Sequence, residues 1–170
     1  MKISRSRLLL VTLAVATLAL ATLAATPLTA AGGDDGQNKH GVRGGGTSLV
    51  AGGTGSPSFI PVMTKFAFNW SGSTGGFECL ALMPSTPTGP GSGNFDTNAM
   101  YVTGPITSVS FGGTTAVFKG TASVTGLGAG SNVPFTATAV AGGPGTTLVL
   151  VISGLTFNEI VLEGQITVKG

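Results

Sequence analysis

Apolar and polar positions alternate with a period of two along most of the chain beyond residue 60. Phe66, Phe68 and Trp70 fall on one face of a single run, and Lys65 and Asn69 fall on the other. This alternation is typical of strands that bury one face. It predicts strands near residues 62–70, 75–83, 97–103, 106–111, 114–124, 132–141, 146–153 and 158–168.

Glycine and proline mark the turns expected between these strands. Gly112-Gly113 predicts a tight hairpin, and Gly104-Pro105 and residues 142–145 predict two further turns. Gly120 falls inside a strand and indicates a bulge or a close backbone approach. Short strands at a spacing of about 8–12 residues, with no helical period beyond residue 31, predict an all-β fold. We expect an antiparallel β-sandwich of eight or nine strands.

The first 31 residues have a different pattern from the rest of the chain. Basic residues, including Arg5 and Arg7, precede an apolar run over residues 8–25, and small residues follow Pro27. This order predicts a helical secretory signal peptide over residues 1–31, cleaved after Ala31. The alternative is a permanent membrane anchor, for which the run is at the short end. We expect an exported protein, secreted or at the cell surface, with no membrane contact after cleavage.

The segment that follows the signal is rich in glycine. Residues 32–47 hold seven glycines and the Asp34-Asp35 pair, a composition typical of a flexible lead-in. We therefore expect three segments: the signal peptide, this lead-in, and a β-sandwich domain over residues 48–170.

Net charge excludes one class of function. The whole chain has a formal net charge of +2, but the residues beyond Ala31 carry five Lys and Arg against six Asp and Glu, a net charge of −1. The basic residues in excess belong to the signal segment, so no basic surface for nucleic acid is expected. Only 8% of residues are charged and 42% are hydrophobic, which argues against disorder.

The residues that usually carry catalysis are scarce. His40 is the sole histidine and falls in the expected lead-in, and Cys79 is the sole cysteine, expected in the core. One histidine and one cysteine far apart cannot form a zinc site or a nucleophile–base pair. We expect no disulfide, metal, cofactor or catalytic residue, and hence no enzyme.

Carboxylates are the remaining candidates for chemistry. Glu159 and Glu163 are four residues apart, so a regular strand would place both on one face about 13 Å apart. That separation is wider than a glycosidase pair needs, and we interpret both as solvated strand residues. Glu78 and Asp96 could meet across strands.

Four short motifs form a pattern that resembles a known group. They are Ala116–Gly120, Pro134-Phe135, Gly143-Pro144-Gly145 and Gly164–Val168. Over roughly residues 62–169 the chain resembles small exported bacterial β domains of the uncharacterised post-COAP type. The resemblance implies export and an all-β fold, and it implies no activity.

These patterns together favour a non-catalytic exported domain with a structural, surface-associated or protein-interaction role. The alternative is a carbohydrate-binding module, in which Tyr101 and Trp70 would stack on a sugar ring. Trp70 shares its face with Phe66 and Phe68, which also fits a place in the core. The expected partner is an extracellular protein or a glycan, and the sequence sets no oligomeric state.

Overall fold

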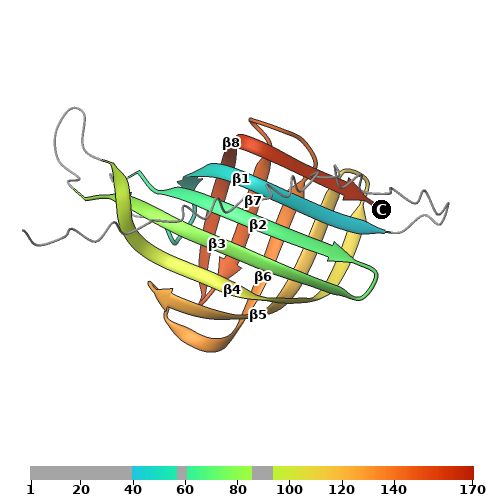
Figure 1. Cartoon of the computed structure of the whole chain (residues 1–170), viewed down its shortest axis with the longest axis horizontal. Helices are drawn as coiled ribbons and strands as arrows, with labels where there is room; N and C mark the ends of the chain where they lie inside the picture. Colours follow the sequence, from blue (N-terminus) through green and yellow to red (C-terminus); the bar gives the residue numbers. More distant parts are fainter. Residues whose placement is uncertain (1–39, 57–60, 86–93) are drawn as a thin grey trace, which may run out of the picture. The chain divides into compact units, whose positions relative to one another are not determined.

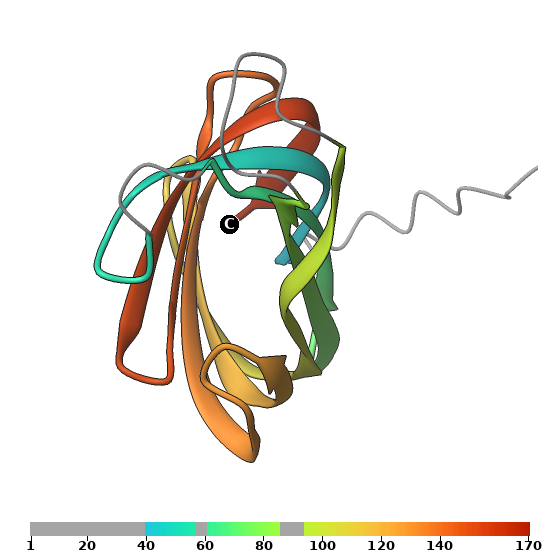
Figure 2. The same ribbon diagram turned by 90° about the vertical axis from the view of Figure 1, so that its left-hand side faces the viewer.

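The computed structural model describes residues 40–56, 61–85 and 94–170 (Figure 1). Over these residues the chain forms eight strands in a closed antiparallel barrel, and Figure 2 shows them encircling a common interior. The all-β prediction is confirmed, while the expected signal peptide lies outside the described residues. The strands are β1 (Gly41–Gly52), β2 (Met63–Ser71), β3 (Thr74–Pro84), β4 (Phe95–Gly112), β5 (Thr115–Gly126), β6 (Gly130–Val140), β7 (Thr147–Ile152) and β8 (Leu155–Lys169).

The predicted sandwich is wrong, because the sheet closes on itself. Each strand pairs with the next in chain order, and β8 then pairs with β1 from Gly41↔Lys169 to Gly52↔Asn158. Closure leaves no unpaired sheet edge. Sandwiches and barrels share the same inward–outward alternation, so the alternation alone could not distinguish them.

The turn predicted at Gly104-Pro105 is also wrong, because β4 continues through it from Phe95 to Gly112. A Cβ atom at Gly104 would lie 2.1 Å from the carbonyl oxygen of Thr121. The glycine therefore lets β5 come close to β4. A register shift between Ile106 and Ser108 follows, and such irregularities bend strands around a barrel.

The fold begins earlier than residue 48, since β1 begins at Gly41. The expected lead-in over residues 32–47 is therefore wrong for its last seven residues, while residues 32–39 lie outside the described part. A Cβ atom at Gly46 would lie 2.0 Å from the carbonyl oxygen of Glu163 on β8. Glycine here allows close packing between strands, although the same composition is typical of flexible linkers.

Aromatic rings fill the middle of the barrel. Phe68 and Phe118 have ring centroids 4.9 Å apart, and those of Phe77 and Phe135 are 5.0 Å apart. We call these four residues the aromatic core. Gly120 makes room for it, since a Cβ atom there would lie 2.7 Å from the ring of Phe135. The close approach predicted at Gly120 is confirmed.

The tight hairpin predicted at Gly112-Gly113 is present, but its two turn residues are Gly113 and Thr114, one position later. Gly112 pairs with Thr115, so a two-residue turn joins β4 to β5. Gly113 has a φ of 61°, a conformation that glycine adopts at little cost.

Candidate functional site

Three polar side chains lie buried inside the barrel: Ser48 of β1, Thr64 of β2 and Glu159 of β8. Their exposed fractions are 0%, 2% and 1%. Both hydroxyl oxygens lie 2.5 Å from Oε2 of Glu159, within hydrogen-bond distance, and they also contact each other. We call these residues the Glu159 cluster. In the described part of the chain they are the only buried polar or charged residues.

Barrel closure brings the Glu159 cluster together. Ser48 is the register partner of Thr64 on β2, and on its other side β1 pairs with β8. Glu159 lies between Phe157 and Val161 in the inward-facing set of β8. Glu159 and Ser48 are 111 residues apart in sequence, so the cluster exists only once the first and last strands have paired.

The expectation that Glu159 and Glu163 are solvated neighbours on one face is wrong for Glu159. The register between β1 and β8 passes from Ser48↔Val161 to Thr47↔Glu163, which leaves Leu162 as an extra residue. This bulge shifts the alternation by one position. Glu159 therefore faces the interior, whereas Glu163 is exposed. The two carboxyl groups form no pair.

The surroundings of Glu159 favour its neutral form. Burial raises the pKa of the Glu159 carboxyl above its usual range, and the hydrogen bonds from Ser48 and Thr64 oppose this rise. The three oxygen–oxygen contacts of the cluster would share only two hydrogens if the carboxyl were ionised. A proton on Oε2 supplies the third hydrogen: Oε2 then donates to one hydroxyl, which donates to the other, which donates back to Oε2.

Cys79 of β3 lies beside this cluster. Its exposed fraction is 1%, so the expectation of a core cysteine is confirmed. Burial raises the pKa of the Cys79 thiol well above its usual value, and a hydrogen bond with Thr64 opposes the rise. A protonated, buried thiol is a poor nucleophile.

An apolar pocket of about 410 Å³ lies at the end of the barrel where β2 begins and β3 ends. Leu127, 50% exposed, and the exposed Thr54 line its outer part. We call it the barrel-end pocket. Its size falls within the range of small-molecule sites, about 300–1,000 Å³. Its inner lining is apolar and includes Val62, Ala81, Met83, Ala99, Leu155 and Phe157.

The barrel-end pocket and the Glu159 cluster are adjacent layers of the interior. Val62 and Phe157 line the pocket, and each lies two residues from a cluster member on its own strand, Thr64 and Glu159 respectively. Two residues of strand span about 7 Å. The cluster therefore lies one layer of side chains below the pocket.

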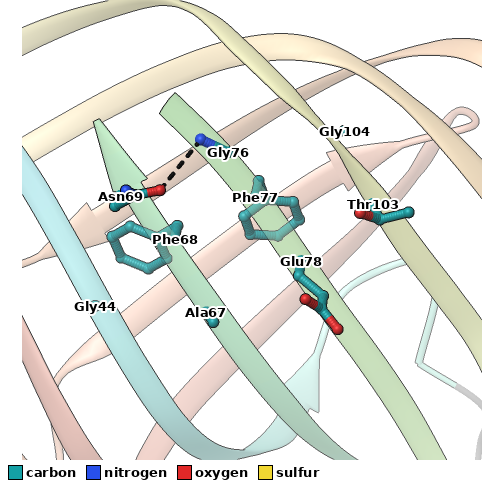
Figure 3. A pocket seen from close by; sticks show the side chains of 9 residues that line it. All are labelled: Gly44, Ala67, Phe68, Asn69, Gly76, Phe77, Glu78, Thr103 and Gly104. Atoms are coloured by element: carbon teal, nitrogen blue, oxygen red, sulfur yellow. Dashed lines mark hydrogen bonds between the residues drawn. The ribbon is translucent and has the colours of Figure 1, made fainter. Parts of the chain in front are cut away.

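A second hollow, of about 360 Å³, lies on the outer face of β2, β3 and β4. Figure 3 shows Asn69, Glu78 and Thr103 around it, and the amide of Gly76 donates to Asn69 Oδ1 at 3.3 Å. Ala67 and the glycines of this region carry little or no side chain, which leaves the surface hollowed. We call it the outer hollow.

The two aromatic residues expected to contact a ligand are not brought together. Tyr101 faces outward on β4, next to the outer hollow, and its hydroxyl donates to Oε1 of Glu78 at 2.9 Å. This hydrogen bond raises the pKa of Tyr101. Trp70 packs against the core and its ring lies 6.0 Å from that of Phe111. The two side chains therefore cannot form one platform.

The other candidate site residues do not come together in the structure. His40 is exposed before β1, with its ring 5.8 Å from that of Phe111. Glu78 is the register partner of Thr103, whereas Asp96 lies at the start of β4, so the two do not meet. Within residues 40–56, 61–85 and 94–170, no group of three His, Cys, Asp or Glu side chains could hold a metal ion.

Two members of the Glu159 cluster, Thr64 and Glu159, carry a signal in the sequence that was not among the expectations above. Thr64 falls in the same alternating set as Phe66 and Phe68, and Glu159 falls in the set of Phe157 and Val161. A polar residue on an otherwise apolar strand face indicates a buried polar group. Ser48 had no such signal, because it follows a run of glycines and lay at the edge of the expected lead-in.

Comparisons with protein-family models, curated proteins and solved structures found no match for this chain. In the described residues there is no helix of the length and apolar character needed to cross a membrane.

Proposed function

We propose that this protein is an exported, non-catalytic barrel that binds a small apolar molecule in the barrel-end pocket. The observation that carries the proposal is the pocket of about 410 Å³ with an apolar inner lining. Eight-stranded barrels have an interior just large enough to be filled by side chains or to hold one small ligand. Here the aromatic core fills the middle, and smaller residues such as Ala81 and Ala99 surround the pocket.

A fluorescent apolar probe tests this proposal. N-phenyl-1-naphthylamine becomes brighter in apolar surroundings, so it should give saturable fluorescence with the folded protein at a stoichiometry of one. Ala99→Leu places extra volume in the pocket wall and should weaken probe binding about tenfold or more. Ala67→Leu makes the same chemical change in the outer hollow and should leave probe binding unchanged.

Failure of saturable binding by the folded wild-type protein would contradict the proposal. Equal weakening by both alanine variants would also contradict it, because the probe would then not be reporting on the barrel-end pocket. Circular dichroism of each variant separates loss of the site from loss of the fold.

The second candidate is glycan binding at the outer hollow. Tyr101 and Glu78 share a hydrogen bond at its edge, and neighbouring Asn69 and Thr103 offer neutral polar groups. A glycan screen tests it: Tyr101→Ala and Ala67→Leu should each abolish glycan binding, while Ala99→Leu should not. Absence of any glycan binding by the wild-type protein rejects this candidate and leaves the first untouched.

A further inference from the structure

The fold does not account for atom Oε1 of Glu159. Glu159 is 1% exposed, and Oε1 has no hydrogen-bond partner among the described residues. Leaving a buried acceptor without a partner costs free energy, and such atoms are rare in folded proteins. Packing alone would be satisfied by an apolar residue, as at Phe157 and Val161 on the same strand face.

The hydrogen bonds of the cluster fix the role left for this atom. Ser48 and Thr64 both contact Oε2 and each other, and the ring of three hydrogen bonds places the proton of a neutral carboxyl on Oε2, so the lone pairs of Oε1 are free. Whether the carboxyl is ionised or carries its proton on Oε2, Oε1 is an acceptor. A ligand group that fits Oε1 must therefore donate a hydrogen bond to it.

The surroundings favour a neutral donor over a cation. The buried residues of the described chain are otherwise apolar, apart from Ser48 and Thr64, and none is basic. An ammonium group would have to leave water and keep Glu159 ionised in this interior, and burying two charges is costly. A hydroxyl group is desolvated at a smaller cost.

Of the barrel-end pocket and the outer hollow, only the barrel-end pocket is lined by a neighbour of Glu159 on the inward face of β8. Phe157 lines that pocket and lies two residues before Glu159 on β8. Ala81 of β3 also lines the pocket and is the register partner of Thr64, so a small side chain lies beside the cluster on the β3 side. A ligand whose body lies in the pocket needs to extend only about 7 Å to the level of the cluster.

We propose that the barrel-end pocket takes an apolar molecule with a terminal hydroxyl group, and that this hydroxyl donates its hydrogen bond to Oε1 of Glu159. This inference rests on the proposed function, since the same pocket holds the apolar body of the ligand. It adds the chemical class of the ligand and the residue that selects it.

Three probes of similar size test the inference by competition against N-phenyl-1-naphthylamine. They are 1-octanol, which donates a hydrogen bond; heptyl methyl ether, which only accepts; and octylamine, which is cationic at neutral pH. For the wild-type protein, octanol should compete about three- to tenfold more strongly than the ether, the range expected for one buried hydrogen bond. Octylamine should compete more weakly than octanol.

Two substitutions locate this preference on Glu159. Glu159→Met keeps a similar length without an acceptor, so octanol and the ether should compete equally. Glu159→Gln keeps a neutral carbonyl acceptor and should retain most of the preference for octanol. Glu163→Gln changes an exposed carboxyl on the same strand and should behave like the wild-type protein.

The competition experiment distinguishes failure of the role of Glu159 from failure of the proposed function. Equal competition by octanol and ether in the wild-type protein would overturn the role of Glu159 while the proposed function stands. Strongest competition by octylamine would overturn the neutral donor. No probe binding at all would instead reject the proposed function. If Glu159→Met fails to fold, the wild-type comparison and Glu159→Gln still decide: loss of the octanol preference in the Gln variant would contradict a neutral acceptor.

Discussion

Gly44 of β1 lies against the ring of Phe68 on β2, so closely that a Cβ atom at Gly44 would be 2.5 Å from Cζ of the ring. The two residues are register partners, and both face the interior. Phe68 belongs to the aromatic core, which leaves its ring little freedom to move away. The glycine at position 44 is therefore part of the packing of the barrel.

This contact predicts that alanine substitution at two neighbouring glycines, Gly44 and Gly45, will lower the free energy of unfolding by very different amounts. Gly44→Ala should lower the free energy of unfolding by about 1–3 kcal/mol, because it overpacks the core. Gly45→Ala is the matched control: its nearest contact would be an ordinary 3.7 Å to the carbonyl oxygen of Phe66. It should change stability by less than about 0.5 kcal/mol. Urea unfolding measures both values, and equal effects would contradict the packing described here.

Glu159 predicts how stability depends on pH. Because its pKa is raised in the folded state, the folded protein keeps a proton that the unfolded chain loses above about pH 4.3. The free energy of unfolding should therefore fall as the pH rises above that value, until the pH exceeds the folded-state pKa. Urea unfolding at a series of pH values between about 4 and 8 measures the fall.

Substitutions at Glu159 and Glu163 test whether the Glu159 carboxyl causes this pH dependence of stability. Glu159→Gln should flatten the fall, while Glu163→Gln should keep it, because Glu163 is exposed and points away from the cluster. Cys79 is the other titratable group beside Glu159, and its raised pKa keeps it protonated over this range. An unchanged slope in Glu159→Gln would show that the carboxyl is ionised in the fold.

Cys79 predicts a protected thiol. A disulfide reagent such as 5,5′-dithiobis(2-nitrobenzoic acid) should react with the folded protein only as fast as the barrel opens, because Cys79 is 1% exposed. The unfolded protein in urea should react at once and serves as the control. Cys79→Ala should cost on the order of 1 kcal/mol. Fast reaction of the folded protein would contradict the buried position.

Export with cleavage of a signal peptide predicts that the mature protein lacks the first 31 residues. If residues 1–31 are a signal peptide, protein recovered from outside the cytoplasm should begin at Gly32. Mass spectrometry of that protein measures the loss. An exported form that retains the apolar run over residues 8–25 would favour a membrane anchor instead.

The strands could be predicted from sequence because their signals are local. Alternation around Phe66 and Phe68 set the inward face of β2, and Gly120 marked a close approach that the structure confirms. Gly44 and Gly46 were misinterpreted because the reason for each glycine lies on another strand: Phe68 on β2 for one, and the backbone of Glu163 on β8 for the other.

Closure and the candidate site were harder to predict because they depend on distant pairing. Whether β1 meets β8 is not contained in the alternation of either strand. Glu159 and Glu163 were placed on one face because nothing local marked the bulge at Leu162. Thr64 and Glu159 carried a usable signal, but the contact between Ser48 and Glu159 spans 111 residues.

The pairing of β1 with β8 also means that the described chain starts and stops at neighbouring points of one ring. Gly41 is the register partner of Lys169, so a short linker between residues 170 and 40 would leave every strand pair intact. New ends could then be placed at the Gly113-Thr114 turn, which joins two strands at the surface. Circular dichroism and urea unfolding of this permuted chain should match those of the original, and loss of the fold would contradict it. In that sense the closed ring of strand pairs, and not the position of the chain ends, holds the described barrel together.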